Sequence, residues 1–213
     1  MSDKFAMTDK FARNFYLERK SFLKDTFERI EQLNLGEEEK EKIRSLTSNL
    51  LTDVFYTILL GLDGEANIGE NQQAYKIYDG NSNLISNRGE LEAKAYEYFH
   101  ENKYEVELSE ADFIASLTYK TTEQGGRKTP AVSGYRPQIK FNYEKMQTSG
   151  EQTFIERKMV FPGDMVKAEI KLLSPEYFEN KLHHGTKFEF REGETIIGTG
   201  KIIHIINEKL KAE

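Results

Sequence analysis

Apolar residues in the first third of the chain are spaced as they are on amphipathic helices. Between residues 11 and 33 they recur mostly at steps of three, four or seven, which places them along one helical face. These residues are Phe11, Phe15, Phe22, Leu23, Phe27, Ile30 and Leu33. The pattern predicts a long amphipathic helix.

A second apolar series follows Gly36 and three consecutive glutamates. Carboxylates in a first turn complement the positive end of a helix dipole, so the glutamates mark a helix start. The series is broad, and it ends near Gly61, Gly64 and Gly69. One face carries Ile43, Leu46, Leu50, Val54 and Ile58, and beside it lie Leu51, Phe55 and Leu59. Such a wide stripe predicts a helix that is buried on more than one side.

Two weaker patterns complete the first half. Residues 73–85 alternate around Asp79, Gly80 and Asn81, which favours two short strands joined by a turn. Residues 90–101 return to helical spacing. We therefore expect residues 1–105 to form a mostly helical domain with a small hairpin.

Beyond residue 105 the apolar period changes from about 3.6 to 2. Residues 113–120 and 166–172 alternate between apolar and polar positions, as half-buried strands do. Further candidate strands are residues 138–143, about 154–160, 187–191 and 195–206, with separators at Gly150, residues 162–164, Gly185 and Gly193. Six short strands with such turn signals predict an antiparallel Greek-key barrel over residues 106–213. The whole chain is expected to be α+β.

Composition narrows the picture. Hydrophobic residues make up 38% of the 213 and charged residues 31%, which is typical of a folded globular protein. The absence of cysteine excludes a disulfide framework, a thiolate zinc site and a cysteine nucleophile. Residues 1–10 lack the apolar stretch of a secretory signal, and the apolar run at residues 50–62 is shorter than the ~20 residues of a membrane span. We expect a cytoplasmic protein with no membrane partner.

The charge of the chain is negative and unevenly distributed. Of the formal net charge of −6, most lies in residues 1–100, which hold 13 Lys and Arg against 18 Asp and Glu. Non-specific binding to nucleic acid depends on cations that displace counterions from phosphates. The charge therefore disfavours such binding, except through a local basic patch.

Four ordered segments in the second half carry the strongest signal. They are GGRKTP at residues 125–130, GYRPQ at 134–138, MVFPGD at 159–164, and FREG at 190–193 leading to GTG at 198–200. In this order they resemble the third, C-terminal domain of translation elongation factor Tu over about residues 111–213. The resemblance implies a small antiparallel β-barrel without catalytic activity of its own.

In that family one edge of the barrel touches the T-stem of aminoacyl-tRNA, and other surfaces touch the GTPase domain and the second barrel. The resemblance carries the RNA-contacting positions onto Arg127, Lys128, Thr129, Gln138, Ser149, Glu192 and Gly193. Lys128 replaces the histidine of the bacterial factors, and Ser149 replaces a threonine. The segment at residues 173–185 departs most from the family and holds about four extra residues around residues 177–184. We therefore do not expect residues 173–185 to make the contacts by which the matching segment of the family touches the GTPase domain.

The basic loop at residues 127–128 has three open interpretations. Arg127 and Lys128, with Arg136 and Lys140 nearby in sequence, could hold phosphates through charge-assisted hydrogen bonds. The same residues could equally form a solvated loop on an inherited scaffold, or contact a protein.

Other chemistry is not supported by the sequence. No P-loop motif occurs, so neither nucleotide binding nor GTP hydrolysis is expected, and no cofactor is implied. Asp79, Asn81, Asn83 and Glu90 have calcium-loop spacing, but Leu84 stands where that loop requires glycine. His183 and His184 lack a spaced partner ligand, and no catalytic constellation is visible. The polar residues Asp63, Glu65, Asn67, Glu70, Gln72 and Gln73 form either a hydrated loop or a partner surface.

These observations favour a non-catalytic binding module associated with the translation machinery, with a protein partner ahead of weak tRNA contact. The candidate binding residues are Arg127, Lys128, Thr129, Arg136, Gln138, Ser149, Glu192 and Gly193. An alternative is an immunity or antitoxin-type decoy that mimics the factor and occupies a toxin or another factor-binding protein.

Overall fold

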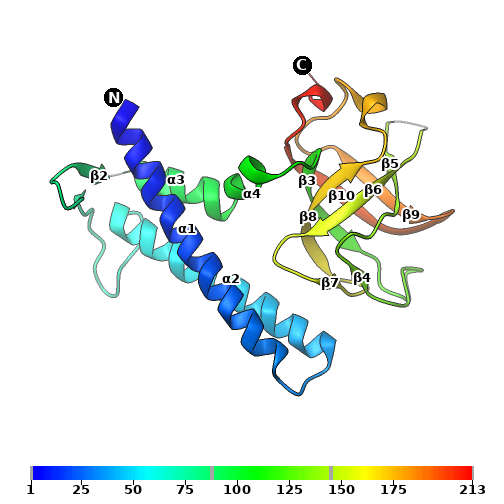
Figure 1. The fold of residues 1–213 in the computed structure, drawn as a ribbon, viewed down its shortest axis with the longest axis horizontal. Helices are drawn as coiled ribbons and strands as arrows, with labels where there is room; N and C mark the ends of the chain where they lie inside the picture. The colour runs from blue at the N-terminus through cyan, green and yellow to red at the C-terminus, as the bar shows by residue number, and fades with distance from the viewer. Residues whose placement is uncertain (1, 87–88, 144–145, 213) are drawn as a thin grey trace. The chain divides into compact units, whose positions relative to one another are not determined.

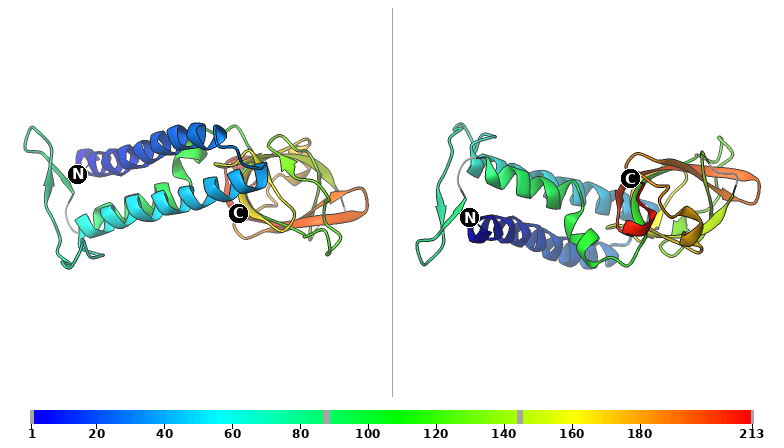
Figure 2. Two further views of the ribbon diagram at one scale, coloured as in Figure 1. Left: turned by 90° about the horizontal axis from the view of Figure 1, so that it is seen from below. Right: turned by 90° about the horizontal axis from the view of Figure 1, so that it is seen from above.

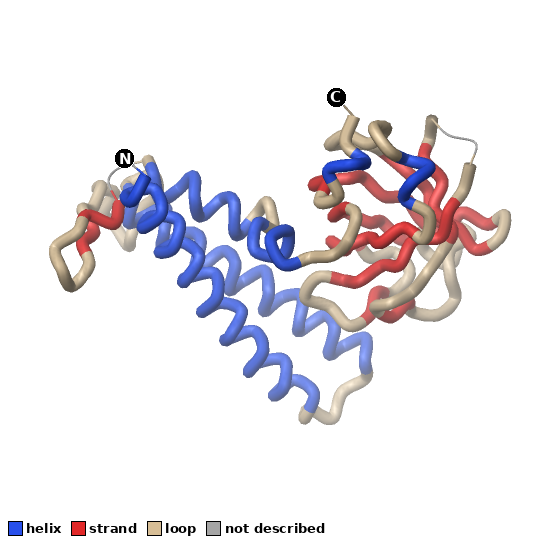
Figure 3. The backbone as a smooth tube through the Cα atoms, turned by 45° about the horizontal axis from the view of Figure 1, so that its top comes forward, coloured by secondary structure: helices blue, strands red, loops and turns tan. Residues whose placement is uncertain are grey.

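The structure is a computed structural model that describes residues 2–86, 89–143 and 146–212. The chain divides into two compact units, residues 1–105 and 106–213. The first consists mainly of helices and the second mainly of strands, as Figure 3 shows. The α+β class expected from the sequence is confirmed.

Three helices build the first unit. They are α1 (Ser2–Glu31), α2 (Glu37–Asp63) and α3 (Glu90–Phe99). A two-stranded hairpin, β1 (Ile77–Tyr78) and β2 (Leu84–Ser86), precedes α3, and a short helix α4 (Lys103–Leu108) follows it. The helices α1 and α2 lie side by side (Figures 1 and 2). The core forms where α1, α3 and the last turns of α2 meet, from Ala12, Tyr16, Leu59, Leu91, Ala95, Tyr98 and Phe99.

The ends of α2 follow the sequence signals. The backbone N–H of Gly36 donates to the Glu39 carboxylate at 2.7 Å, which satisfies a free donor at the first turn. Gly64 ends the helix in the left-handed region, at a φ of 86°, where a side chain would be strained. The second predicted helix therefore begins and ends where the glutamates and glycines indicated.

The face that α2 turns toward α1 is polar along its first half. The Arg19 guanidinium donates to the hydroxyls of Thr52 and Ser48, each at 3.0 Å. Arg44, almost fully buried, pairs with Glu41 at 2.8 Å and with Glu31 at 2.6 Å. Buried guanidinium groups are stable only when such acceptors are present, so these contacts hold the two helices together.

The broad apolar stripe of α2 is not buried on a second side. Leu46, Leu50, Val54 and Ile58 are between 42% and 70% exposed. The expectation of burial on a second side was wrong because the first half of α2 meets α1 through polar side chains, which the apolar pattern cannot reveal. By length and composition alone, α2 is also the single helix in the described chain that could cross a membrane.

The polar residues after α2 have a partly structural role. Asp63 is buried, and its carboxylate accepts the backbone N–H of Glu92 at 2.9 Å in the first turn of α3. Gln72 donates to the carbonyl of Gly64 at 3.0 Å. Asp63 thus caps α3 from a distance and does not belong to a surface cluster.

The second unit is a closed six-stranded barrel, as the sequence predicts (Figure 1). Its antiparallel strands neighbour one another in the order β10, β3, β8, β6, β5 and β9. Their bounds are β3 Phe113–Tyr119, β5 Gln138–Phe141, β6 Thr148–Phe154, β8 Met165–Leu172, β9 Lys187–Glu192 and β10 Thr195–Ile205. A separate two-stranded sheet joins β4 (Ala131–Val132) to β7 (Met159–Val160). Two short 3₁₀ helices, Pro175–Phe178 and Glu208–Leu210, lie outside the strands.

Two glycines in β10 make room for the aromatic core. A Cβ at Gly198 would lie 2.1 Å from the Phe190 ring, and one at Gly200 would lie 2.1 Å from the Phe188 ring. Both rings are buried, and the Phe188 ring packs against those of Phe113 and Phe141. These close ring contacts explain why glycine stands at both positions of the GTG segment.

One strand lies earlier than the sequence predicts. The strand expected at about residues 154–160 is β6, Thr148–Phe154, whereas Met159 and Val160 belong to the small sheet. The inward positions of β6 are Thr148, Gly150 and Gln152, so the apolar alternation that marks a strand is missing. Gly150 is not a separator. It lies within β6, and the Cδ1 atom of Ile139 on the neighbouring strand would lie 2.2 Å from a Cβ at that position.

Candidate partner-binding surface

The loop before β4 holds Arg127 in a set of contacts with its own barrel. Its guanidinium pairs with Glu192, lies 4.5 Å above the Tyr135 ring, and donates to the Thr129 carbonyl at 3.2 Å. The Tyr135 hydroxyl donates to the same Glu192 carboxylate at 2.6 Å. Burial raises the pKa of Tyr135, and the neighbouring guanidinium opposes that rise only in part. Arg127, Thr129 and Glu192 therefore form one cluster, with Gly193 adjacent in the β9–β10 turn.

The other two cations of the expected site differ in their surroundings. Arg136 is 71% exposed and donates to Glu151 at 2.7 Å through Nε. Lys128 is exposed, and within residues 2–86, 89–143 and 146–212 it forms no ion pair. Of the three cations, two are neutralised by carboxylates, which reduces the positive potential that the basic loop was expected to offer.

Gln138 and Ser149 come together by strand pairing. Gln138 on β5 is the direct partner of Ser149 on β6 and of Arg191 on β9. Arg191 in turn pairs with Glu189 at 3.1 Å through Nε. The barrel thus places Gln138 between the Ser149 strand and the strand that leads to Glu192.

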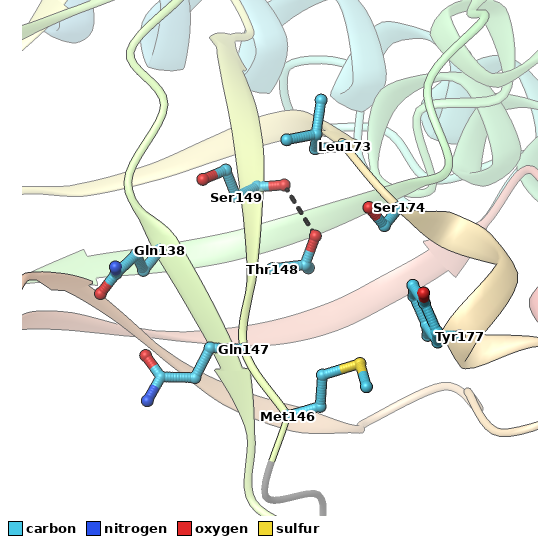
Figure 4. Close-up of a pocket in the computed structure, with 8 residues that line it drawn as sticks. All are labelled: Gln138, Met146, Gln147, Thr148, Ser149, Leu173, Ser174 and Tyr177. Carbon is cyan, nitrogen blue, oxygen red and sulfur yellow. Dashed lines mark hydrogen bonds between the residues drawn. The ribbon is translucent and has the colours of Figure 1, made fainter.

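A groove of about 270 Å³ opens beside this pair (Figure 4). Gln138 and Gln147 lie toward one side of it, and Ser174 and Tyr177 toward the other. The remaining lining comes from Met146, Thr148, Ser149 and Leu173. The groove therefore combines amides and hydroxyls with an apolar rim.

That rim is strongly exposed. Leu173 is 78% exposed, Tyr177 52% and Met146 43%. Large exposed apolar side chains beside a groove are typical of sites that bind other molecules. Apolar side chains such as Leu173 and Met146 offer a phosphate no hydrogen-bond donors. The groove therefore suits apolar groups of a ligand better than phosphates.

Sequence reasoning did not assign the rim residues to the site. The available signal was the departure of residues 173–185 from the family pattern, which includes both Leu173 and Tyr177. An insertion is better tolerated at a surface than in a core, so this departure pointed to an exposed feature. Tyr135 was missed as well, because its role depends on contacts between residues distant in sequence.

The candidate metal sites do not assemble in the described part of the chain. Residues 2–86, 89–143 and 146–212 contain no group of three or more His, Asp or Glu side chains placed to hold an ion. The Asp79 carboxylate instead accepts the backbone N–H groups of Asn81 and Asn83, each at 2.8 Å. That arrangement is an ordinary Asx turn.

Comparison with known families agrees with this architecture. The family model described as the elongation factor Tu C-terminal domain matches residues 108–206. The matched segment contains all six strands of the closed barrel, and it contains every residue of the Arg127 cluster and of the groove. The resemblance drawn from the four sequence segments is confirmed. Over residues 108–206, the barrel of this chain is thus similar to elongation factor Tu C-terminal domains.

Proposed function

We propose that this chain is a non-catalytic binding module associated with the translation machinery, and that its barrel docks a protein partner. The observation that carries the proposal is the match of residues 108–206 to a domain of a translation factor. That domain is a non-catalytic barrel, so its contribution is expected to be binding. The groove beside Gln138 and Ser149 is the proposed contact surface.

The charges on this surface support a protein over RNA. Arg127 and Arg136 are already paired with Glu192 and Glu151, which leaves Lys128 as the cation best able to reach a phosphate. Contacts to two or three phosphates give a shallow salt dependence, about 0.7 to 0.9 log units of affinity per phosphate for each log unit of salt. Affinity for tRNA should then be roughly tens of micromolar or weaker at physiological salt.

The apolar rim supports the same choice. Leu173 and Tyr177 expose apolar surface that phosphates and ribose cannot cover well. Tyrosine is enriched where proteins bind one another, because its ring buries a large area with little loss of side-chain entropy. We expect Tyr177 to contribute most of the binding energy in the groove.

Affinity capture from cell lysate tests the proposal. The wild-type chain should retain a protein that the double variant Leu173→Asp, Tyr177→Ala loses. Met165→Ala is the matched control, since Met165 is 63% exposed on the barrel but lies outside the groove lining. Identification of a captured toxin would favour the decoy hypothesis, whereas a ribosomal or tRNA-modifying protein would favour the accessory role.

Titration of labelled tRNA tests the ranking of partners. Wild type and the double variant Arg127→Ala, Lys128→Ala should both bind weakly, with little difference between them. Submicromolar binding that the double variant abolishes would make RNA the primary partner and overturn the proposal.

A further inference from the structure

The outward face of α2 forms a continuous apolar ridge. Leu46, Leu50, Val54 and Ile58 follow one another at intervals of four residues, and their exposed fractions are 70%, 58%, 43% and 42%. Side chains at this interval form the ridges by which one helix packs against another. The contacts of α2 with α1 through Arg19 and Arg44 use the opposite, polar side of the helix.

The ridge continues past the end of the helix. Ile68, 40% exposed, folds back over Gly61, where a Cβ would come within 2.4 Å of its Cγ1. Glycine at position 61 is thus what allows Ile68 to pack on the helix. Glycine destabilises the interior of a helix, so Gly61 weakens α2 but lets Ile68 extend the apolar surface.

The two halves of this surface differ in shape. Its C-terminal half contains a groove of about 390 Å³ whose apolar walls are Val54, Ile58 and Ile68. Its N-terminal half carries the two most exposed leucines of the ridge, Leu46 and Leu50, neither of which lines that groove. Within the described residues, a protruding half and a hollow half thus follow each other along one helix.

We propose that this face is a dimer interface, in which α2 packs antiparallel against α2 of a second copy of the chain. A twofold axis beside residue 52 places Leu46 opposite Ile58 and Leu50 opposite Val54. Each protruding half then fills the groove of the other copy. A surface with a projection and a complementary hollow related in this way is self-complementary, as an isologous interface requires.

The area is sufficient for such a pairing. Five side chains exposed by 40% to 70% present roughly 400 to 500 Å² of apolar surface on each copy. Polar neighbours at the edge of the ridge, such as Asn49 and Asp53, would bring the total for two copies to about the 1,000 Å² that specific interfaces exceed. Antiparallel packing also opposes the two helix dipoles.

Sedimentation of the full chain at several concentrations tests the proposal. Wild type should have twice the mass of the chain at tens of micromolar, whereas Leu50→Glu should be monomeric, with its dissociation constant raised at least 100-fold. Because Leu50 is 58% exposed, the substitution should leave the helical circular dichroism unchanged. Met165→Glu is the matched control, since Met165 is 63% exposed on the barrel and lines neither groove, and it should remain dimeric.

Spin labels test the direction of pairing, and the absence of native cysteine makes single labels simple to introduce. With a rise of 1.5 Å per residue, the antiparallel arrangement displaces the two copies of residue 42 by about 30 Å along the axis, but those of residue 49 by only about 9 Å. Labels on Lys42→Cys should therefore be about 20 Å farther apart than labels on Asn49→Cys.

Any one of four results would overturn the dimer. The first is a wild type that stays monomeric at about 200 μM. The second is a dimer that Leu50→Glu leaves intact, and the third is a dimer in which the two label distances are equal. The fourth is flotation of wild type, but not of Leu50→Glu, with phosphatidylcholine–phosphatidylglycerol vesicles, which would assign the face to a lipid surface.

Discussion

Gly198 and Gly200 show how single residues fix the interior of the barrel. The rings of Phe190 and Phe188 occupy the space that a methyl group at either glycine would need. Neither the glycine backbone, which is held in β10, nor the buried rings can move away without disturbing the neighbouring strands.

Gly198→Ala is therefore expected to destabilise the barrel by about 2 to 4 kcal/mol, because overpacking displaces Phe190 from its position. Urea unfolding followed by circular dichroism in the β region measures the change. Lys201→Ala is the control, since Lys201 is exposed on the same strand and its side chain lies outside the aromatic core. Equal stability of the two variants would show that the ring contact is not limiting.

The resemblance implied that Arg127, Glu192 and Gln138 share one edge of the barrel, and in the structure they lie close together. The sequence did not reveal the charge of this edge. It could not show that the Arg127 guanidinium pairs with Glu192 and packs on Tyr135. Glu192 is 65 positions and Tyr135 is 8 positions from Arg127, and both contacts form only when the strands are in place. Nor could it show the rim of the groove, which forms only when the segment after β8 meets the start of β6.

At the scale of elements, an ion-pair network ties α1 to α3 and α4. Lys103 donates to Asp9 at 2.5 Å and to Glu97 at 2.7 Å, and the Tyr98 hydroxyl also donates to Asp9 at 2.9 Å. Partial burial alone would raise the pKa of Asp9 and of Glu97, but the hydrogen bonds from Lys103 and its neighbours outweigh it and hold both pKa values below their ordinary range. Burial alone would lower the pKa of Lys103, yet the two carboxylates raise it.

These shifts fix the direction of the pH dependence. A carboxyl group whose pKa is depressed by folding stabilises the fold above its unfolded pKa, and that contribution is lost as the pH falls through the folded value. The contribution of Lys103 is complete below its unfolded pKa and is lost only at strongly alkaline pH. The helical unit should thus lose stability below about pH 4.5, where the carboxyl groups of Asp9 and Glu97 begin to bind protons in the unfolded chain but not yet in the folded one.

Lys103→Met should lower the stability of the helical unit by about 1 kcal/mol at pH 7 and by less at pH 3.5, because protonation removes the same attraction. Urea unfolding followed at 222 nm at the two pH values measures both changes. Lys42→Met serves as the control, since the Lys42–Glu38 pair is 72% and 60% exposed and should contribute little. An effect of Lys103→Met that is the same at both pH values would show that protonation of Asp9 and Glu97 does not weaken their pairing with Lys103.

The bounds of helices and strands were predicted well where one face of the element is apolar, and poorly where the inward face is polar. The alternation in β3 and β8 located both strands, and the glycines located the end of α2. In β6 the inward positions Thr148, Gly150 and Gln152 are not apolar, so the alternation of a strand was not visible. In α2 the apolar residues do share one face, but that face is exposed. Periodicity reports which residues share a face, but not what lies against it.

At the scale of the whole molecule, the barrel should fold without the helical unit. Its six long strands are paired in a closed ring, so removal of residues 1–105 uncovers no edge of the barrel. A fragment that begins near Tyr104 should be soluble, with β-rich circular dichroism and a cooperative melt. An unfolded fragment would mean that the two units share a core.

The full chain should neither bind nor hydrolyse GTP. No P-loop occurs in its 213 residues, and the guanine-reading Asn-Lys-x-Asp motif is missing as well. Calorimetry with GTP and magnesium should show no heat of binding. Micromolar association would require a nucleotide site of a different kind and would contradict this expectation.

The barrel closes between its first strand, β3, and its last, β10, where Phe113 pairs with Ile205. Until that late segment of the chain exists, β3 and β9 each lack a neighbour on one side, and the sheet cannot close. Pairing of such distant segments is slow, on the order of milliseconds to seconds for all-β domains. The barrel should therefore form late and in one step during synthesis, after the helices of the first unit, whose contacts are closer in sequence.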